Sequence, residues 1–232
     1  MTNNLAVPPR SAAVSAYLDK LKPASAPRAG GTGRVVFALD ATASRQPTWD
    51  TACQLQHEMF DAVAGLGALF VQLVYFRGYD ECRASKWLFS TAELHRVMQG
   101  VTCLGGETQI ERVLSHTIRE TGKTKVGALV FVGDAIEEKV DRLARLAGDL
   151  GKLGTPTFIF HEGHTPAVAD AFRQLALLSG GVYLPFDRSG IDRLRALLGA
   201  IAVYAVGGYA ALEAYGRKQG GEVLRLTSQL RP

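Results

Sequence analysis

Short apolar runs that recur along the chain are the feature that most constrains its fold. Each run is continuous and is bounded by glycine, proline or polar residues. A strand exposed on one face would alternate apolar and polar residues, so continuous runs predict strands covered on both faces of a sheet. The predicted strands are RVVFAL (34–39), ALFVQLVYF (68–76), KVGALVFV (125–132), TPTFIF (155–160) and GVYLPF (181–186).

The segments between these runs carry apolar residues at helical spacing. In residues 48–65, Cys53, Leu55 and Met59 are examples. Further helices are predicted at 91–99, 109–121, 139–153, 165–180 and 189–204. This alternation predicts an α/β fold, a doubly wound, mostly parallel, Rossmann-like sheet with right-handed crossovers and helices on both faces.

One exception to parallel pairing is expected in the first half of the chain. Residues 77–84 (RGYDECRA) have the composition of a turn, and 85–90 (SKWLFS) have that of a short strand. A strand that follows a turn so closely returns beside its predecessor. We therefore expect 85–90 to form one antiparallel edge strand beside 68–76.

The composition divides the chain into three parts. Residues 1–33 comprise an amphipathic helix expected at 11–21 and a linker at 22–33 rich in proline, glycine and alanine. Residues 34–202 hold the alternating elements of one domain, and 203–232 form a C-terminal extension. The linker glycines do not form a phosphate-binding loop, because no Gly-Lys-Ser/Thr follows them and the next element is a strand.

Composition also limits the classes of function. The chain has 232 residues, of which 47% are hydrophobic, so it can bury a core. The net charge of +4 is not gathered in a Lys/Arg run, which argues against nucleic-acid binding. Three cysteines do not indicate a disulfide framework, and the N-terminus lacks a secretory signal, so we expect a cytoplasmic protein.

The longest uncharged stretch lies near the C-terminus, at residues 197–212. It is shorter than the roughly 20 residues that a membrane-spanning helix needs. We therefore expect a buried helix broken at Gly207 and Gly208, with no membrane span. Docking of this stretch on a membrane or a partner protein is the alternative.

Oxygen-bearing side chains follow two of the predicted strands. Asp40, Thr42 and Ser44 come at alternate positions after the first strand, and Asp134 follows 125–132. In doubly wound sheets, sites form at the carboxyl ends of strands where the winding reverses, and the GGET loop would bring Thr108 to the same edge. Oxygen donors without histidine or cysteine suit Mg²⁺, Mn²⁺ or Ca²⁺. The pattern therefore predicts a divalent-metal site.

DATAS (40–44), the GGET loop and Asp134 resemble the metal-ion-dependent adhesion site (MIDAS) of von Willebrand factor A-type (VWA) domains. That family's pattern is Asp-x-Ser-x-Ser, then a distant Thr, then a distant Asp. The resemblance covers about residues 34–200, including the order of strands and helices. It implies a bacterial, stand-alone domain that binds a carboxylate of a partner protein through the metal, with complexes of AAA+ ATPases among the possible partners.

The same resemblance implies a role for each residue of the site. Ser44 and Thr42 would bind the metal directly, Asp40 and Asp134 would hold it largely through water, and Thr108 would join in one conformational state. Thr42 stands where serine is usual, but it keeps the hydroxyl. A coordination position would stay open for the partner's carboxylate.

Two other interpretations remain at this stage. A Mg²⁺-dependent phosphatase-like hydrolase also places an aspartate after its first strand, but it has a second aspartate where this chain has Thr42. A metal-free scaffold is the other. Because the motif contains neither an activated nucleophile nor a general base, and the chain has no G-x-S-x-G, we expect a binding module and not an enzyme.

Several neighbouring features have simpler explanations. We expect Glu137 and Glu138 in the first turn of a helix, although they could instead tune the rim of the metal site. Glu107 is expected to cap the helix that follows the GGET loop, although it could instead shade the open position of the metal. The segment HEGH (161–164) lacks the H-E-x-x-H spacing of zinc enzymes and is expected to be a polar loop.

The cysteines that lie in predicted loops, Cys82 and Cys103, offer one further alternative. They could form a redox-sensitive pair, but two unrelated thiols are the expectation in a cytosolic protein.

Overall fold

A computed structural model of the chain describes residues 31–186 and 191–230. The helix expected at 11–21 and most of the linker lie outside these residues.

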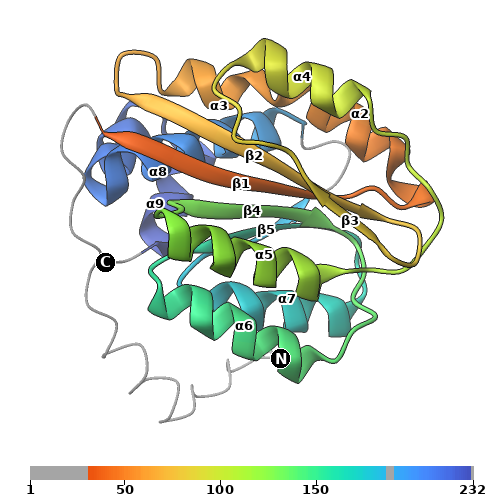
Figure 1. Ribbon diagram of the computed structural model, residues 1–232. Coiled ribbons are helices and arrows are strands. Elements are labelled where there is room, and N and C mark those ends of the chain that lie inside the picture. Colours follow the sequence, from red (N-terminus) through yellow and green to blue (C-terminus); the bar gives the residue numbers. More distant parts are fainter. Residues whose placement is uncertain (1–30, 187–190, 231–232) are drawn as a thin grey trace, which may run out of the picture.

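A six-stranded sheet in the order β3-β2-β1-β4-β5-β6 forms the centre of the described structure (Figure 1). All neighbouring strands run parallel except β2 and β3. The strands are β1 (Thr32–Asp40), β2 (Ala68–Arg77), β3 (Glu81–Ala84), β4 (Ala128–Gly133), β5 (Thr157–Glu162) and β6 (Tyr183–Phe186). All six residues of β4 are buried, as expected for a strand covered on both faces.

Helices cover both faces of the sheet (Figure 1). One face packs against α2 (Gln46–Leu55), α3 (His57–Ala62), α4 (Thr91–Gln99), α8 (Ile191–Gln219) and α9 (Gly221–Gln229). The other face packs against α5 (Ile110–Lys123), α6 (Val140–Lys152) and α7 (Pro166–Leu178). The predicted doubly wound, mostly parallel α/β fold with one antiparallel strand is therefore confirmed.

The antiparallel strand is not the segment that the sequence predicted. It is Glu81–Ala84, inside the expected turn, whereas in 85–90 only Leu88 pairs with β2, as an isolated bridge to Val71. The turn is shorter than expected because Gly78 takes a φ of 60°, which reverses the chain within a few residues. Charged Glu81 and Arg83 alternate with Cys82 and Ala84 in this edge strand and hid it from a search for apolar runs.

Helix α8 forms part of the core. By length and composition its segment Asp192–Gln219 could cross a membrane. However, 50% of an apolar 18-residue stretch within it is buried inside the protein. It also bends at Gly208, where φ is 67° and ψ is −164°, so the expected break is confirmed. Leu198 before the bend and Leu212 after it both belong to the same core cluster. The helix thus runs through residue 202, where we placed the end of the domain.

Two central strands determine where a functional site can form. β1 lies between β2 and β4, and Leu39 pairs with Val132 at the carboxyl end of both strands. The chain leaves β1 towards α2 on one face, whereas β4 continues to α6 on the other. The winding therefore reverses between β1 and β4, which is the position where doubly wound sheets bind ligands.

Candidate functional site

Asp40 is the residue at the centre of this edge. It ends β1, and only 5% of its surface is exposed. Its carboxylate oxygen Oδ1 accepts a hydrogen bond of 2.8 Å from the backbone N–H of Thr42. No arginine, lysine or histidine among the described residues forms an ion pair with it. A buried carboxylate without a cation is unusual, because burial disfavours the charged form.

The electrostatics of Asp40 reflect this burial. Desolvation raises the pKa of its carboxyl group from 3.8 to about 6, although hydrogen bonds from Thr42 oppose the rise. The charge of Asp134 adds to the rise and that of Arg45 reduces it. The structure thus brings the two predicted aspartates within electrostatic reach of each other.

Thr42 and Ser44, the two hydroxyl residues of the predicted site, differ in backbone conformation and in exposure. Thr42 keeps an extended backbone, with φ of −69° and ψ of 162°, and is partly buried. The chain then turns into a short 3₁₀ helix, Ala43–Arg45, so the backbone is extended only as far as Thr42. Ser44 is exposed. Ser44 is therefore accessible to solvent, four residues after the buried Asp40.

Arg45 is the main residue of this edge that sequence reasoning missed. Its side chain is only 5% exposed, and its guanidinium forms an ion pair of 2.8 Å with Asp134. The same group pairs with Glu162 and donates a hydrogen bond of 2.5 Å to the hydroxyl of Thr48. Arg45 therefore links the ends of β4 and β5 to the start of α2. Its place directly after DATAS was the only sequence signal.

Thr108 also has partners in the structure. Its hydroxyl donates a hydrogen bond of 2.5 Å to Glu138 and accepts one of 3.0 Å from the backbone N–H of Glu137. The backbone N–H of Thr108 donates to the Glu137 carboxylate at 2.6 Å. The GGET loop is therefore fastened to the loop that follows Asp134, next to the aspartate that it was predicted to approach.

Two expectations about acidic residues here are wrong. Helix α6 starts at Val140, so Glu137 and Glu138 precede it and are not in its first turn. Glu107 does not cap α5, because Glu138 accepts from the backbone N–H of Glu111 at 3.1 Å and fills that role from a neighbouring loop. An acid at a helix N-terminus is favoured wherever it comes from in the sequence, so local spacing could not identify it.

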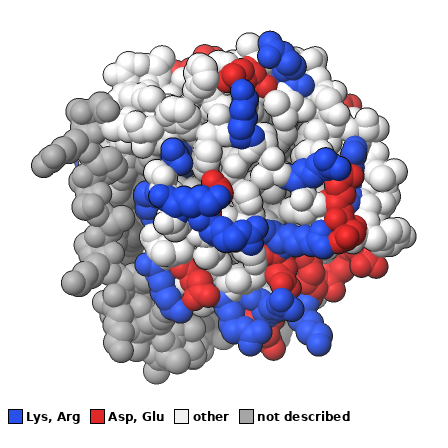
Figure 2. Space-filling view, viewed as in Figure 1, with Lys and Arg blue, Asp and Glu red and all other residues white. Residues whose placement is uncertain are grey.

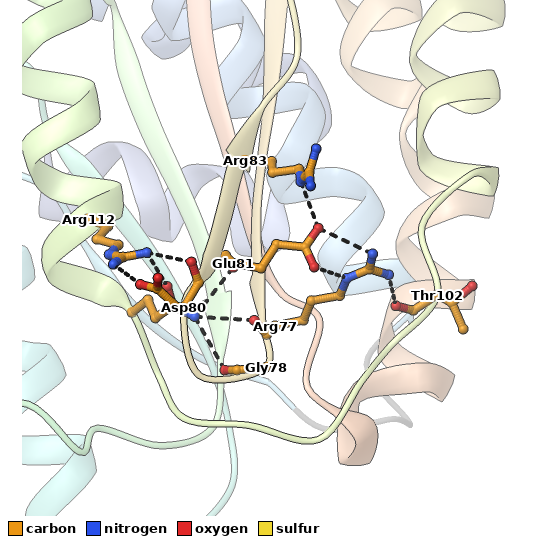
Figure 3. A network of polar contacts seen from close by, with 8 residues as sticks. Arg77, Gly78, Asp80, Glu81, Arg83, Thr102 and Arg112 are labelled. Atoms are coloured by element: carbon orange, nitrogen blue, oxygen red, sulfur yellow. Dashed lines mark hydrogen bonds and ion pairs between the residues drawn. The ribbon is translucent and has the colours of Figure 1, made fainter.

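The other side of the GGET loop rests on the turn between β2 and β3. Gly106 lies so close to this turn that a Cβ atom on it would come within 2.0 Å of the Gly78 carbonyl oxygen. Arg77 donates a hydrogen bond of 2.5 Å to the Thr102 carbonyl and pairs with Glu81 (Figure 3). The GGET loop is thus held between the β2–β3 turn and the loop that follows Asp134.

The segment HEGH is not a polar loop at its start. His161 and Glu162 are the last residues of β5, and their side chains point to opposite faces of the sheet. His161 is fully buried and forms a hydrogen bond of 2.8 Å with the Tyr183 hydroxyl. Glu162 points to the other face and meets Arg45.

The cysteines are free thiols, as expected. Cys82 packs in the core on the α5 face and Cys103 in the core on the α2 face, so the sheet separates them. Burial raises the pKa of both thiols to about 11, which keeps them protonated near neutral pH.

The predicted donor set fits a divalent cation only in part. Asp40, Thr42 and Ser44 present oxygen atoms without a competing cation of their own, whereas Asp134 pairs with Arg45 and Thr108 bonds to Glu138. Among the described residues, no three histidine, cysteine or acidic side chains converge as they do in a metal site. A cation here would depend on hydroxyl groups and would compete for Asp134.

Comparison with known proteins shows the fold class. No protein-family model and no curated protein matches the sequence. Similar solved structures include the VWA domain of SpRpn10, at 12% identity and a TM-score of 0.56 over 71% of this chain and 94% of that one. Another is an aerotolerance-related membrane protein from Bacteroides fragilis, at 17% identity and a TM-score of 0.53 over 73% of this chain and 96% of that one.

A third similar structure is proximal thread matrix protein 1 from the mussel byssus. It has 16% identity and a TM-score of 0.58, over 76% of this chain and 47% of that one, so the present chain spans about half its length. At these identities the similarity establishes the fold alone. The chain has a VWA-type fold.

The contact between Gly106 and Gly78 gives a test of how the GGET loop is held. We expect Gly106→Ala to lower the free energy of unfolding by about 1–3 kcal/mol, because the added methyl group meets backbone that must shift. Gly105→Ala is the matched control, since a Cβ there meets nothing within 4 Å. Urea denaturation of both variants measures the difference, and equal effects would contradict the close packing.

The burial of Asp40 predicts a pH-dependent effect. In a metal chelator, Asp40→Asn should raise the free energy of unfolding near pH 7 by up to about 3 kcal/mol, because the native pKa of about 6 lies above the ordinary 3.8. The sign follows from protonation. Between about pH 4 and pH 6 the native state binds more protons than the unfolded state, so wild-type stability falls as pH rises through this range.

Urea denaturation between about pH 4 and pH 7.5 measures this effect. The gain of Asp40→Asn should shrink towards the acidic end, where wild-type Asp40 is neutral too. Asp61→Asn, at an exposed aspartate, is the control and should stay within about 0.5 kcal/mol of wild type throughout. A gain that does not depend on pH would show that burial does not perturb Asp40.

Proposed function

We propose that this chain is a protein-interaction module that uses the carboxyl edge of β1 and β4 to bind an acidic residue of a partner protein through a divalent metal, with Mg²⁺ as the candidate and Mn²⁺ or Ca²⁺ as alternatives. The proposed ligand set is Asp40, Thr42, Ser44, Thr108 and Asp134. The observation that carries the proposal is Asp40, a carboxylate that is 5% exposed and has no ion pair with a described residue.

The surroundings of Asp40 support a cation there. Besides Asp134, this edge carries the carboxylates of Glu137 and Glu138, in the loop after β4, and of Glu162, at the end of β5, and Arg45 pairs with two of these four. Buried charges in proteins are paired or coordinate metals. Oxygen ligands alone favour Mg²⁺, Mn²⁺ or Ca²⁺ over softer metals.

Each residue of the proposed set has a distinct task. Asp40 supplies the buried negative charge, with its orientation fixed by the Thr42 N–H. Ser44 lies at the exposed side, where a partner can approach. Thr108 and Asp134 would exchange their present partners, Glu138 and Arg45, for the metal. A divalent cation bound there would supply an open coordination position for the partner's carboxylate.

The arrangement supports binding more than catalysis. The hydroxyl of Thr48 is buried, with Arg45 as its donor and Glu162 as its acceptor, so a substrate does not reach it, and the imidazole of His161 is enclosed on the α7 face. We propose that the chain is not an enzyme, that it acts in the cytoplasm, and that its partner belongs to a larger assembly such as a complex of an AAA+ ATPase.

A calorimetric titration of metal-stripped protein with Mg²⁺ and Mn²⁺ tests the site. We expect saturable binding that Ser44→Ala weakens by about tenfold or more, because it removes a ligand oxygen. Ser44 is exposed, so this change should leave the unfolding free energy of the metal-free protein unaltered. Ser228→Ala, at an exposed serine of α9, is the matched control and should bind metal like wild type.

The metal site, the phosphatase interpretation and the metal-free scaffold predict different results. Absence of binding in wild type, or equal binding in both serine variants, contradicts a metal at DATAS. Hydrolysis of a phosphate ester that disappears in Asp40→Asn would instead establish the phosphatase interpretation. A thermal midpoint that no divalent metal changes would support a metal-free scaffold, because a ligand that binds only the native state raises stability.

The ion pair between Arg45 and Asp134 provides a second test of the proposed metal site. Because the Arg45 guanidinium pairs with Asp134, it should compete with the metal for that carboxylate. The double variant Arg45→Gln/Glu162→Gln removes one charge of each sign and leaves the local net charge unchanged. We expect it to bind Mg²⁺ about tenfold more tightly than wild type in the same titration. Unchanged or weaker binding would show that Arg45 does not compete.

A further inference from the structure

The outer edge of β3 carries unpaired backbone groups. β3 ends the sheet and pairs only with β2. The carbonyl of Phe76 in β2 accepts from Ala41 N–H at 2.9 Å, so Phe76 points its backbone groups away from β3. Cys82 lies opposite Phe76 in a pair without hydrogen bonds, so its backbone N–H and C=O point away from β2 and outward. The same holds for Ala84, two residues later. No described residue pairs with them.

A groove runs beside this edge, on the face of the sheet that α5 covers. Its volume is about 300 Å³. The side chains of Cys82 and Ala84 form one wall, because they point to the α5 face in register with Phe76 and Val74. The Cys82 thiol stays neutral near neutral pH because burial raises its pKa to about 11, so this wall carries no charge.

The rim of the groove is basic. Its lining includes Arg112 and Arg119 of α5 against one acid, Glu111, which pairs with Arg142. Arg83 of β3 also lines it, but its side chain points to the other face and pairs with Glu81. Arg119 is exposed and forms no ion pair with a described residue. Arg112 already pairs with Asp80 (Figure 3). Figure 2 shows Lys and Arg side chains in a band across this face of the molecule.

The charges determine which strand can join the edge. Arg83 lies between the open groups and Lys86 follows them, with side chains 70% and 79% exposed, although Arg83 pairs with Glu81 and Lys86 with Glu93. Lysine and arginine on an edge strand prevent two copies of a protein from pairing there, because like charges would face each other. They favour a strand that carries acidic side chains.

We propose that the β3 edge and the adjoining groove bind an extended acidic segment of a partner protein as an additional strand of the sheet. The partner's backbone pairs with the outward N–H and C=O groups of Cys82 and Ala84. Alternate side chains of the segment then point to the α5 face, where a carboxylate meets Arg119. A nucleic-acid backbone has acceptors but no regularly spaced donors for the outward carbonyls, so a peptide is the better match.

This surface is separate from the metal site and needs no metal. The test is therefore made in the presence of a metal chelator, so its failure says nothing about the proposed metal-dependent function. The probe is a fluorescent peptide of about eight alternating glutamate and valine residues, a common strand length. Its affinity is measured by fluorescence anisotropy, and hydrogen exchange reports on the amides of Cys82 and Ala84.

Two variants of the protein address the charge and the backbone separately. Arg119→Glu should weaken the affinity by about tenfold or more, because it places like charges together. Lys218→Glu, at an exposed lysine of α8, makes the same change of charge on the other face and should leave the affinity unchanged. Ala84→Pro removes one outward N–H without removing a bond to β2, and it should also weaken binding.

A change in the peptide covers the case in which Ala84→Pro fails to fold. Methylation of alternate peptide nitrogens removes the donors of one edge of the probe and should abolish binding to the wild-type protein. Binding of the unmethylated peptide with slower exchange at Cys82 and Ala84 supports the proposal.

Three results would overturn it. They are an acidic peptide that does not bind, a lysine–valine peptide or a single-stranded oligonucleotide that binds as well or better, and binding that leaves the two amides unprotected.

Discussion

The position of β1 between β2 and β4 is the constraint on which the rest of the structure depends. Because both neighbours run parallel to it and helices cover both faces, β1 is buried along nearly its whole length. The last residue of β1 is therefore buried inside the protein and does not lie at the surface. A carboxylate at that position, Asp40, loses water that it would have in an ordinary loop, and the pKa rises as a result.

The other polar contacts of this edge can be understood as a balance of charge around Asp40. Arg45 neutralises part of the acidity by joining Asp134 and Glu162, and the backbone N–H groups around Thr108 and Glu111 accommodate Glu137 and Glu138. The edge still carries more carboxylates than cations among these residues. This excess of negative charge is the reason why we propose the metal-dependent contact there.

The two proposed surfaces bind their partners through different kinds of interaction. At the carboxyl edge of β1, specificity comes from a few oxygen atoms in a site that loops complete. At the β3 edge, it comes from a row of backbone groups and a basic rim. The turn between β2 and β3 touches both, since Gly78 supports the GGET loop and the same turn begins β3. An interaction module with two such surfaces could hold two segments of one partner or join two partners.

The sequence by itself determined the strand and helix alternation, the doubly wound sheet and the placement of Asp40 and Asp134 at one edge. The first of these follows from apolar periodicity, which is local in the sequence, and the others from general rules for how parallel strands connect and where they end. It also determined the break in α8, because a glycine pair interrupts an apolar helix.

Only the tertiary structure decided which partners these residues have. Arg45 meets Glu162, 117 residues away, and Thr108 meets Glu138, 30 residues away. Burial of an arginine or a glutamate depends on a partner that no local pattern reveals. For the same reason the sequence misplaced the edge strand, because Glu81 and Arg83 form a strand only where β2 offers its free edge. Hydrophobic burial can be read from periodicity, whereas the pairing of charges depends on how the finished fold brings distant loops together.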